Sequence, residues 1–239
     1  MNKKLITALI LIIILAIVAF GAYYVNEYYH ADESVNEYLN GTDNVTVKKI
    51  ENGLFLDGPS KDTALIFYPG AKVEYTSYMP LLMKLSNDGV DCFLVEMPFN
   101  IAFFGEDSAS KILDDYDYNH TYISGHSLGG VVASQYLNKT DKIDGLILLD
   151  SYPTKHIKKP VLSIYGSEDN VLNYEKYNES KPLMDNLTEI IIDGGNHAQV
   201  GNYGIQDGDG AAKISSQKQQ GLTAKAMDDF IEKTNTYIF

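Results

Sequence analysis

Short apolar segments alternate with helix-like stretches through most of this chain, and no other feature restricts the possible fold as strongly. Each segment is a continuous apolar run, which is typical of a strand buried on both faces of a sheet. The alternation predicts an α/β fold, a mostly parallel central sheet with helices on both faces, and 239 residues suit one such domain. The expected strands are 64–68, 91–97, 122–124, 145–149, 161–165 and 189–192, after an edge strand or hairpin near 45–56. The expected helices are 76–88, 106–114, 127–138, 171–184 and 211–235.

The N-terminal segment differs from the rest, because the 21 residues from Leu5 to Val25 carry no charge. As a helix this segment would be about 31 Å long, which matches the hydrocarbon core of a bilayer. The lysines at positions 3 and 4 favour a cytoplasmic N-terminus, so we expect the remaining chain on the extracytoplasmic side. The sequence therefore predicts an N-terminal membrane anchor at 1–25, a polar stalk at 26–44 and the folded domain at 45–239.

A cleaved signal peptide is the alternative for this segment, and the protein would then be secreted. Ala19-Phe20-Gly21 provides a small-x-small cleavage site. The length of the apolar stretch and the bulky tyrosines that follow it favour an uncleaved anchor.

Charge and cysteine content narrow the range of partners. The net charge of −13 would repel the phosphates of nucleic acids, and it opposes attraction to an anionic membrane surface. The single cysteine, Cys92, lies in an apolar run and excludes an intrachain disulfide. Because no Cys/His cluster has the spacing of a metal site, we expect no metal and no cofactor.

A Gly-x-Ser-x-Gly motif follows one of the expected strands, with Gly125, Ser127 and Gly129 at the fixed positions. This spacing serves a sharp strand-to-helix turn that lifts the serine oxygen clear of the sheet. The glycines are needed because larger side chains two residues either side of the serine would collide with the neighbouring strand and helix. Ser127 is therefore the candidate nucleophile.

Two further residues complete a candidate catalytic set at the carboxyl ends of the strands, where such sheets gather their chemistry. Asp169 and His197 each follow an expected strand. His197 would accept the proton of Ser127, and Asp169 would fix the imidazole tautomer and stabilise its charged form. Glu168, next to Asp169, and Asp150, at the end of the preceding strand, are the alternatives for the acid.

Two backbone N–H groups are expected to form an oxyanion hole. Leu128 directly follows the nucleophile, and Ala71 lies in the loop after the strand 64–68. An ordinary Pro-Gly turn is the alternative for that loop.

The substrate pocket is expected to be open or covered by loops alone, because only about ten residues separate the strand 145–149 from the next strand. No large cap domain fits there. Candidate pocket walls are Tyr68 and the aromatic residues of the apolar segment 98–105, namely Phe99, Phe103 and Phe104. Core packing at a strand-to-helix junction is the alternative for that segment.

The Gly-rich loop 201–210 follows His197 and carries Asp207 and Asp209. Two carboxylates in such a loop resemble part of a calcium site, although the full ligand set is missing. Capping of the following helix is the alternative role.

With these residues in place, the chain resembles the α/β-hydrolase superfamily, and more closely its alpha/beta hydrolase fold-5 domain proteins, many of which are membrane-anchored. The matching blocks are 67–74, 97–105, 125–130, 163–169 and 194–199, and the last continues through 203–204 to 208–210. The resemblance implies the hydrolase fold. It carries Ser127, Asp169 and His197 over as nucleophile, acid and base, in the chain order that this superfamily uses. It implies no particular substrate, and Tyr68-Pro69 stands where many hydrolases carry a His-Gly pair.

These observations lead to one functional expectation, a carboxylesterase-like serine hydrolase. It would act on a carboxylic ester or related small acyl substrate through an acyl-enzyme. The alternatives are an acyltransferase that uses the same nucleophile and a non-catalytic binding protein with the hydrolase fold, although the latter predicts a broken triad.

Overall fold

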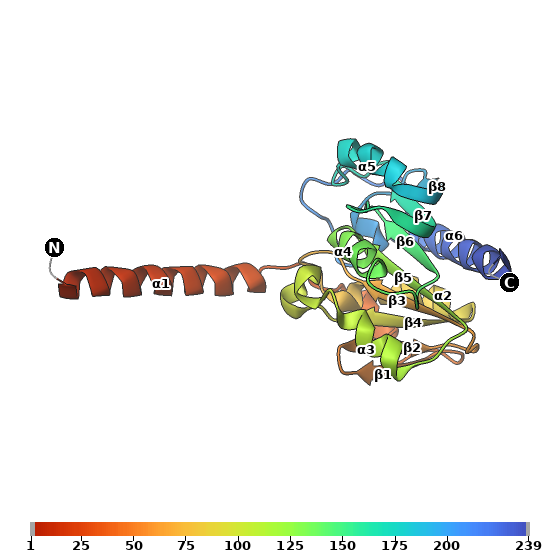
Figure 1. The fold of residues 1–239 in the computed structure, drawn as a ribbon, viewed down its shortest axis with the longest axis horizontal. Coiled ribbons are helices and arrows are strands. Elements are labelled where there is room, and N and C mark those ends of the chain that lie inside the picture. Colours follow the sequence, from red (N-terminus) through yellow and green to blue (C-terminus); the bar gives the residue numbers. More distant parts are fainter. Residues whose placement is uncertain (1–2, 238–239) are drawn as a thin grey trace.

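The computed structural model describes residues 3–237 and contains one sheet of eight strands flanked by helices (Figure 1). The strand order is β1-β2-β4-β3-β5-β6-β7-β8, in which β1–β2 and β2–β4 pair antiparallel and all other neighbours pair parallel. The strands are β1 (Thr46–Ile50), β2 (Gly53–Asp57), β3 (Thr63–Tyr68), β4 (Val90–Val95), β5 (His120–His126), β6 (Gly145–Leu149), β7 (Ile157–Gly166) and β8 (Met184–Ile192). The predicted mostly parallel α/β sheet is confirmed.

Helices cover both faces of the sheet, as the alternation of segments predicts (Figure 1). The α-helices are α1 (Lys3–Asn26), α2 (Met79–Asn87), α3 (Ser108–Asp115), α4 (Leu128–Leu137), α5 (Tyr174–Ser180) and α6 (Ser216–Tyr237). Short 3-10 turns are η1 (Glu33–Glu37), η2 (Tyr75–Tyr78), η3 (Pro98–Asn100), η4 (Ala102–Gly105), η5 (Lys181–Leu183) and η6 (Ala198–Val200). Helices α2 and α6 pack on one face and α3 and α4 on the other, and β6 connects directly to β7 without a cap domain.

The four central strands are buried along their whole length, which explains their continuous apolar sequences. Successive side chains of a strand point to opposite faces of the sheet. In β3, Leu65 and Phe67 therefore join the core under α2 and α6. Ala64, Ile66 and Tyr68 join the core under α3 and α4.

Helix α1 extends away from the domain, and none of its residues is buried (Figure 1). Its mean hydropathy of 3.1 over the apolar window makes it a candidate membrane span. A helix of 24 residues is about 36 Å long, enough to cross a bilayer core.

The segment after α1 corrects the prediction of a stalk at 26–44, because part of this segment packs against the domain. Val35 is 2% exposed and belongs to the core under α2 and α6. Tyr29 forms a parallel β-bridge with Val73, and its N–H donates to the carbonyl of Lys72 at 2.7 Å. The many Asn, Asp and Glu residues of this segment conceal the few apolar side chains that attach it, so its composition alone suggested a free stalk.

Candidate active site

Ser127 lies in the sharp turn between β5 and α4, with φ 52° and ψ −123°. A positive φ is unfavourable for a residue with a side chain, and such strain is kept where the surrounding structure enforces it. Here the N–H of Ser127 donates to the carbonyl of Leu149 at 2.9 Å, and its carbonyl accepts a hydrogen bond from Ser151 Oγ at 2.7 Å. Hydrogen bonds to Leu149 and Ser151 thus fix the conformation of the turn.

Close backbone contacts leave no room for a side chain at Gly125 and Gly129 of the motif. A Cβ atom on Gly125 would overlap the backbone of Gly129, and one on Gly129 would overlap the carbonyl groups of Tyr68 and Pro69. The turn therefore packs directly against the loop that follows β3. This contact brings the N-terminus of α4 next to the loop that contains Ala71.

His197 and Asp169 are hydrogen-bonded to each other, with His197 Nδ1 at 2.9 Å from Asp169 Oδ2. Both side chains are almost fully buried. The other carboxylate oxygen of Asp169 accepts the N–H groups of Val171 at 2.7 Å and Leu172 at 2.8 Å. Burial opposes ionisation of Asp169, but the hydrogen bond and charge of His197 outweigh it and hold its pKa below the ordinary value. Asp169 is therefore an ionised partner for the imidazole.

A pocket of about 200 Å³ brings Ser127 and His197 to one surface, and Asp169 lies behind the imidazole. Its walls come from α4 and from the loops after β6 and β7. The lining residues are Ser127, Leu128, Val131, Asp150, Ser151, Tyr152, Val171, Leu172, Asn173 and His197.

The two alternatives for the acid have other hydrogen-bond partners. Glu168 forms an ion pair with Lys213 at 2.7 Å on the surface. Asp150 is buried, and its Oδ1 accepts the N–H of Gly166 at 3.0 Å. Burial, reinforced by the negative charge of Asp169, raises the pKa of Asp150 well above its usual range.

His126 lies beneath the site, with its ring centroid 4.5 Å from that of His197. Burial, and then the proximity of His197, lowers the pKa of His126 well below its usual value, so its imidazole is neutral. The hydroxyl of Tyr78 accepts the N–H of Gly70 at 3.0 Å and lies 2.8 Å from His126 Nδ1. The Tyr78 hydroxyl thus connects the loop after β3 with the imidazole of His126.

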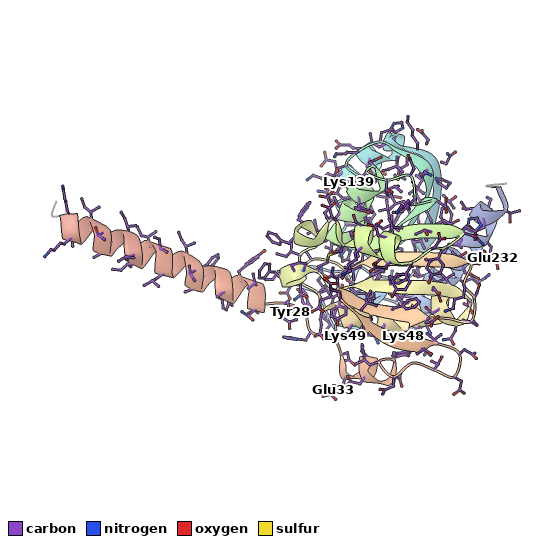
Figure 2. The ribbon with its side chains drawn as sticks, turned by 60° about the horizontal axis from the view of Figure 1, so that its bottom comes forward. Tyr28, Glu33, Lys48, Lys49, Lys139 and Glu232 are labelled. Carbon is purple, nitrogen blue, oxygen red and sulfur yellow. The ribbon has the colours of Figure 1, made fainter. Side chains whose placement is uncertain are left out.

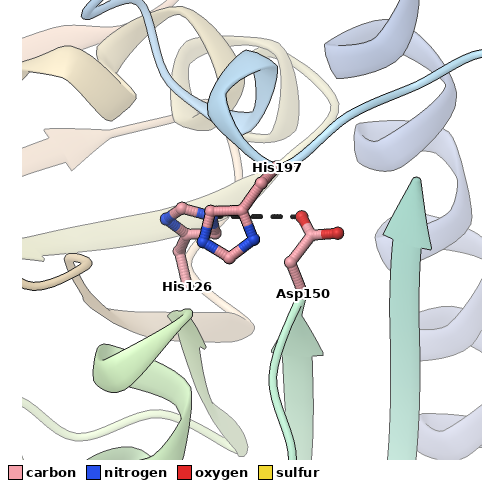
Figure 3. Close-up of side chains that lie close together, drawn as sticks. All are labelled: His126, Asp150 and His197. Carbon is pink, nitrogen blue, oxygen red and sulfur yellow. Dashed lines mark ion pairs between the residues drawn. The ribbon is translucent and has the colours of Figure 1, made fainter. Parts of the chain in front are cut away.

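His126, Asp150 and His197 lie close together, as Figure 3 shows, with His126 Nε2 at 3.9 Å from Asp150 Oδ2. Each offers an atom of a type that binds metals, and these atoms lie within 4.8 Å of one another. A metal ion held there would occupy His197, the same imidazole that lines the pocket with Ser127.

The predicted oxyanion donors are the N–H groups of Leu128, at the start of α4, and of Ala71, in the loop after β3. The N–H groups on either side of Ala71 are already hydrogen-bonded. Gly70 donates to Tyr78, and Lys72 donates to the carbonyl of Asn100 at 2.7 Å. Within residues 3–237, no hydrogen bond engages the N–H of Ala71 or of Leu128. Ala71 thus carries the unengaged N–H between two that are already bonded.

The predicted pocket walls are placed differently from expectation. Tyr68 is fully buried in the core under α3 and α4, where its hydroxyl donates to the carbonyl of Glu106 at 2.7 Å and accepts the N–H of Ala109 at 3.0 Å. The phenylalanines of η3 and η4 are exposed on the surface, and the pocket at Ser127 includes none of them: Phe99, Phe103 and Phe104. The strand alternation that sends Tyr68 to the far face explains the first difference.

Asp209 is a contributor to the site that sequence reasoning misjudged. Its Oδ2 accepts the N–H of Ala198 at 2.9 Å. Its Oδ1 accepts the N–H groups of Gly210 at 2.8 Å, Asn170 at 3.3 Å and His197 at 3.4 Å. The carboxylate thus clamps the backbone of the His197 loop, instead of serving as a calcium ligand or a helix cap. The Asp-rich loop was the available signal, but its partners are set by the tertiary fold.

Solved structures with the same fold share only low sequence identity with this chain. A bacterial membrane phospholipase A superposes with a TM-score of 0.60 at 12% identity, over 98% of this chain and 99% of its own. MGS-MChE2, an alpha/beta hydrolase enzyme from the metagenome of lagoon sediments at Mar Chica, Morocco, gives 0.58 at 15% identity, over 77% and 98%. Ferulic acid esterase from Streptomyces cinnamoneus gives 0.59 at 15% identity, over 74% and 68%. Comparison with curated proteins finds no significant match.

The sequence of the folded domain matches a family model directly. Residues 64–221 match the model of the alpha/beta hydrolase family, Abhydrolase_5. The matched region runs from β3 to the N-terminal part of α6, so it includes the turn at Ser127 and the loops of Asp169 and His197. It covers well over half of the chain, and the strand order agrees with the same assignment. This chain belongs to the alpha/beta hydrolase family.

Proposed function

We propose that this protein is a membrane-anchored serine hydrolase that cleaves a carboxylic ester or a related acyl compound. One observation carries the proposal: the strained turn presents Ser127 in a pocket that also contains His197, whose Nδ1 is bonded to an ionised Asp169. A serine hydroxyl needs a base to become a useful nucleophile, and a histidine oriented by a carboxylate is such a base.

In the proposed reaction, Ser127 Oγ attacks the acyl carbon while His197 Nε2 accepts its proton. The Nδ1–H of His197 stays hydrogen-bonded to Asp169, whose negative charge stabilises the imidazolium. The N–H groups of Leu128 and Ala71 bind the developing oxyanion. His197 then protonates the leaving group, which leaves the acyl group on Ser127. Water, activated by His197, attacks this acyl-enzyme and releases the carboxylic acid and free Ser127.

The neighbouring carboxyl of Asp150 has a supporting part in this proposal. Burial and the negative charge of Asp169 raise its pKa, which disfavours a second negative charge beside Asp169 in the buried site. The neutral His126 beneath it likewise adds no charge. Asp169, which is bonded to His197 Nδ1, would therefore be the main group that stabilises the imidazolium.

Helix α1 supports the anchoring part of the proposal, through its length and its exposed apolar surface. With Lys3 and Lys4 on the cytoplasmic side, the hydrolase domain would lie outside the cytoplasm. Retention of α1 is tested by the intact mass of the purified protein and by its resistance to alkaline carbonate extraction from membranes. A mature chain that begins at Ala22, directly after the Ala19-Phe20-Gly21 site, would show that the segment is a signal peptide.

The catalytic part is tested by labelling the full chain, in detergent micelles, with a fluorophosphonate probe. The wild type should be labelled, and the Ser127→Ala and His197→Ala variants should not. Matched controls are Ser60→Ala and His156→Ala, whose side chains lie outside the site and should leave labelling unchanged. A folded wild type that resists the probe, or a Ser127→Ala variant that still reacts, would overturn the proposal.

A further inference from the structure

Three phenylalanines form an exposed apolar patch on η3 and η4, which we call the aromatic patch. Phe99, Phe103 and Phe104 are 59%, 53% and 64% exposed. The rings of Phe99 and Phe104 contact each other edge-on, with centroids 5.7 Å apart. Their neighbours Met97 and Ala102 are buried in the core, so the turns are attached to the domain while the rings face outward. Contiguous exposed aromatic surface of this kind marks an interaction site.

The backbone is held in the conformation that turns these rings outward. Phe99 and Asn100 both have positive φ, 58° and 55°, which is unfavourable for residues with side chains. Hydrogen bonds fix this turn on both sides. The N–H of Asn100 donates to the carbonyl of Met97 at 3.0 Å, and its carbonyl accepts the N–H of Lys72 at 2.7 Å. The exposure of the patch is thus built into the fold.

The aromatic patch lies beside the point where α1 meets the domain. Helix α1 contacts η3, and Figure 1 shows these turns, in yellow-green, next to the end of the red helix. Lys72, whose N–H is bonded to Asn100, also places its Nζ over the ring of Tyr24 at 4.2 Å. Tyr24 lies in the last turns of α1. A single group of contacts therefore connects the patch with the candidate membrane span.

The charges around the aromatic patch indicate which kind of membrane surface the patch can contact. Residues 97–105 include no charged side chain. At the end of this segment, Glu106 and Asp107 are paired at 3.1 and 2.8 Å with Lys139, which Figure 2 labels. A neutral aromatic patch on a chain of net charge −13 has no electrostatic attraction to anionic lipid. Aromatic rings are favoured at the membrane–water interface without charge attraction.

We infer that Phe99, Phe103 and Phe104 insert into the interfacial region of the same bilayer that holds α1, and so seat the domain on the membrane. The contact is apolar and needs no anionic lipid. The inference rests on the proposed retention of α1 as an anchor and does not depend on catalysis. Because the patch follows β4 at the carboxyl edge of the sheet, this seating turns the edge that carries Ser127 towards the lipid surface.

The absence of tryptophan from the sequence gives a direct test. The full-length Phe103→Trp variant is reconstituted, one chain per particle, in nanodiscs of phosphatidylcholine that is brominated near the headgroup. The matched control is Glu232→Trp, whose position lies at the opposite end of the domain from Tyr28 in Figure 2. The emission of Phe103→Trp should be blue-shifted and quenched several-fold more strongly than that of the control, equally at low and high salt.

Equal emission maxima and equal quenching for the two variants would overturn the inference. A blue shift without lipid quenching would also overturn it, because the ring would then be covered by protein. Thermal unfolding checks that the substitution leaves the fold intact, and Phe104→Trp provides an independent second position. Fluorophosphonate labelling of the same samples reports the proposed catalytic function separately, so either idea can fail while the other stands.

Discussion

Asp209 offers the sharpest test of how the fold positions the proposed base. Its two carboxylate oxygens accept four backbone N–H groups, those of Asn170, His197 and Gly210 on Oδ1 and that of Ala198 on Oδ2. In an Asp209→Asn variant only one oxygen remains an acceptor, and an NH₂ group replaces the other. The orientation of the amide that keeps the three bonds to Oδ1 places the NH₂ group against the N–H of Ala198, a residue that is 2% exposed.

The expected loss follows from this geometry. A buried donor that loses its acceptor costs about 1–3 kcal/mol of folding free energy. At about 2 kcal/mol, the melting temperature of a domain of this size should fall by roughly 4–8 °C. Ala198 directly follows His197, and small displacements of a catalytic group are costly, so the rate constant for fluorophosphonate labelling should fall about 10-fold or more.

Asp207→Asn is the matched control, because Asp207 is an exposed carboxylate two residues away in the same loop. Within residues 3–237, the only hydrogen bond of Asp207 runs from its backbone N–H to the Tyr29 hydroxyl, and the substitution leaves it in place. Melting is followed by circular dichroism and labelling by gel fluorescence, both on the full chain. If Asp209→Asn melts and labels like Asp207→Asn, the clamp on the His197 loop has no energetic importance.

Three further results are expected. Asp169→Asn should slow fluorophosphonate labelling about 10²-fold or more while Glu168→Gln leaves it unchanged, because an amide cannot hold the proton-accepting tautomer of the imidazole; equal rates would identify the wrong acid. Because the pKa of Asp150 is raised in the folded protein, unfolding becomes more favourable as pH rises above the ordinary carboxyl pKa. The Asp150→Asn variant should therefore melt at a higher temperature than wild type at pH 8, and this difference should be smaller near pH 4. Burial raises the pKa of Cys92 to about 12 in a side chain with no exposed surface, so iodoacetamide should react with it only as the protein unfolds, and rapid native-state alkylation would contradict the structure.

The central strands could be predicted from the sequence because both faces are buried, which makes each strand a continuous apolar run. The same criterion found only part of β7 and β8. The predicted 161–165 extends to Ile157–Gly166, and 189–192 extends to Met184–Ile192. These strands lie towards the edge of the sheet, where exposed positions carry polar residues that interrupt the apolar run.

Part of the candidate site could be predicted from local sequence, and part depends on the tertiary fold. The turn at Ser127 follows from local spacing, because the glycines and the serine lie within five residues. The choice among Asp150, Glu168 and Asp169 is tertiary, since it depends on which carboxylate reaches His197 Nδ1. The apolar segment 98–105 was ambiguous for a similar reason, because composition cannot show whether a ring faces a pocket, a core or the surface.

The connection between α1 and the domain is very short. Helix α1 ends at Asn26, and Tyr29 is already paired with the domain, so only Glu27 and Tyr28 lie between them. With α1 in a bilayer, so short a tether would confine the domain to encounters by lateral diffusion within a thin layer above the lipid. Turnover of a membrane-borne ester would then follow its mole fraction in the surface and not its amount per volume. Dilution with inert lipid, at a constant total quantity of ester, should slow such a reaction.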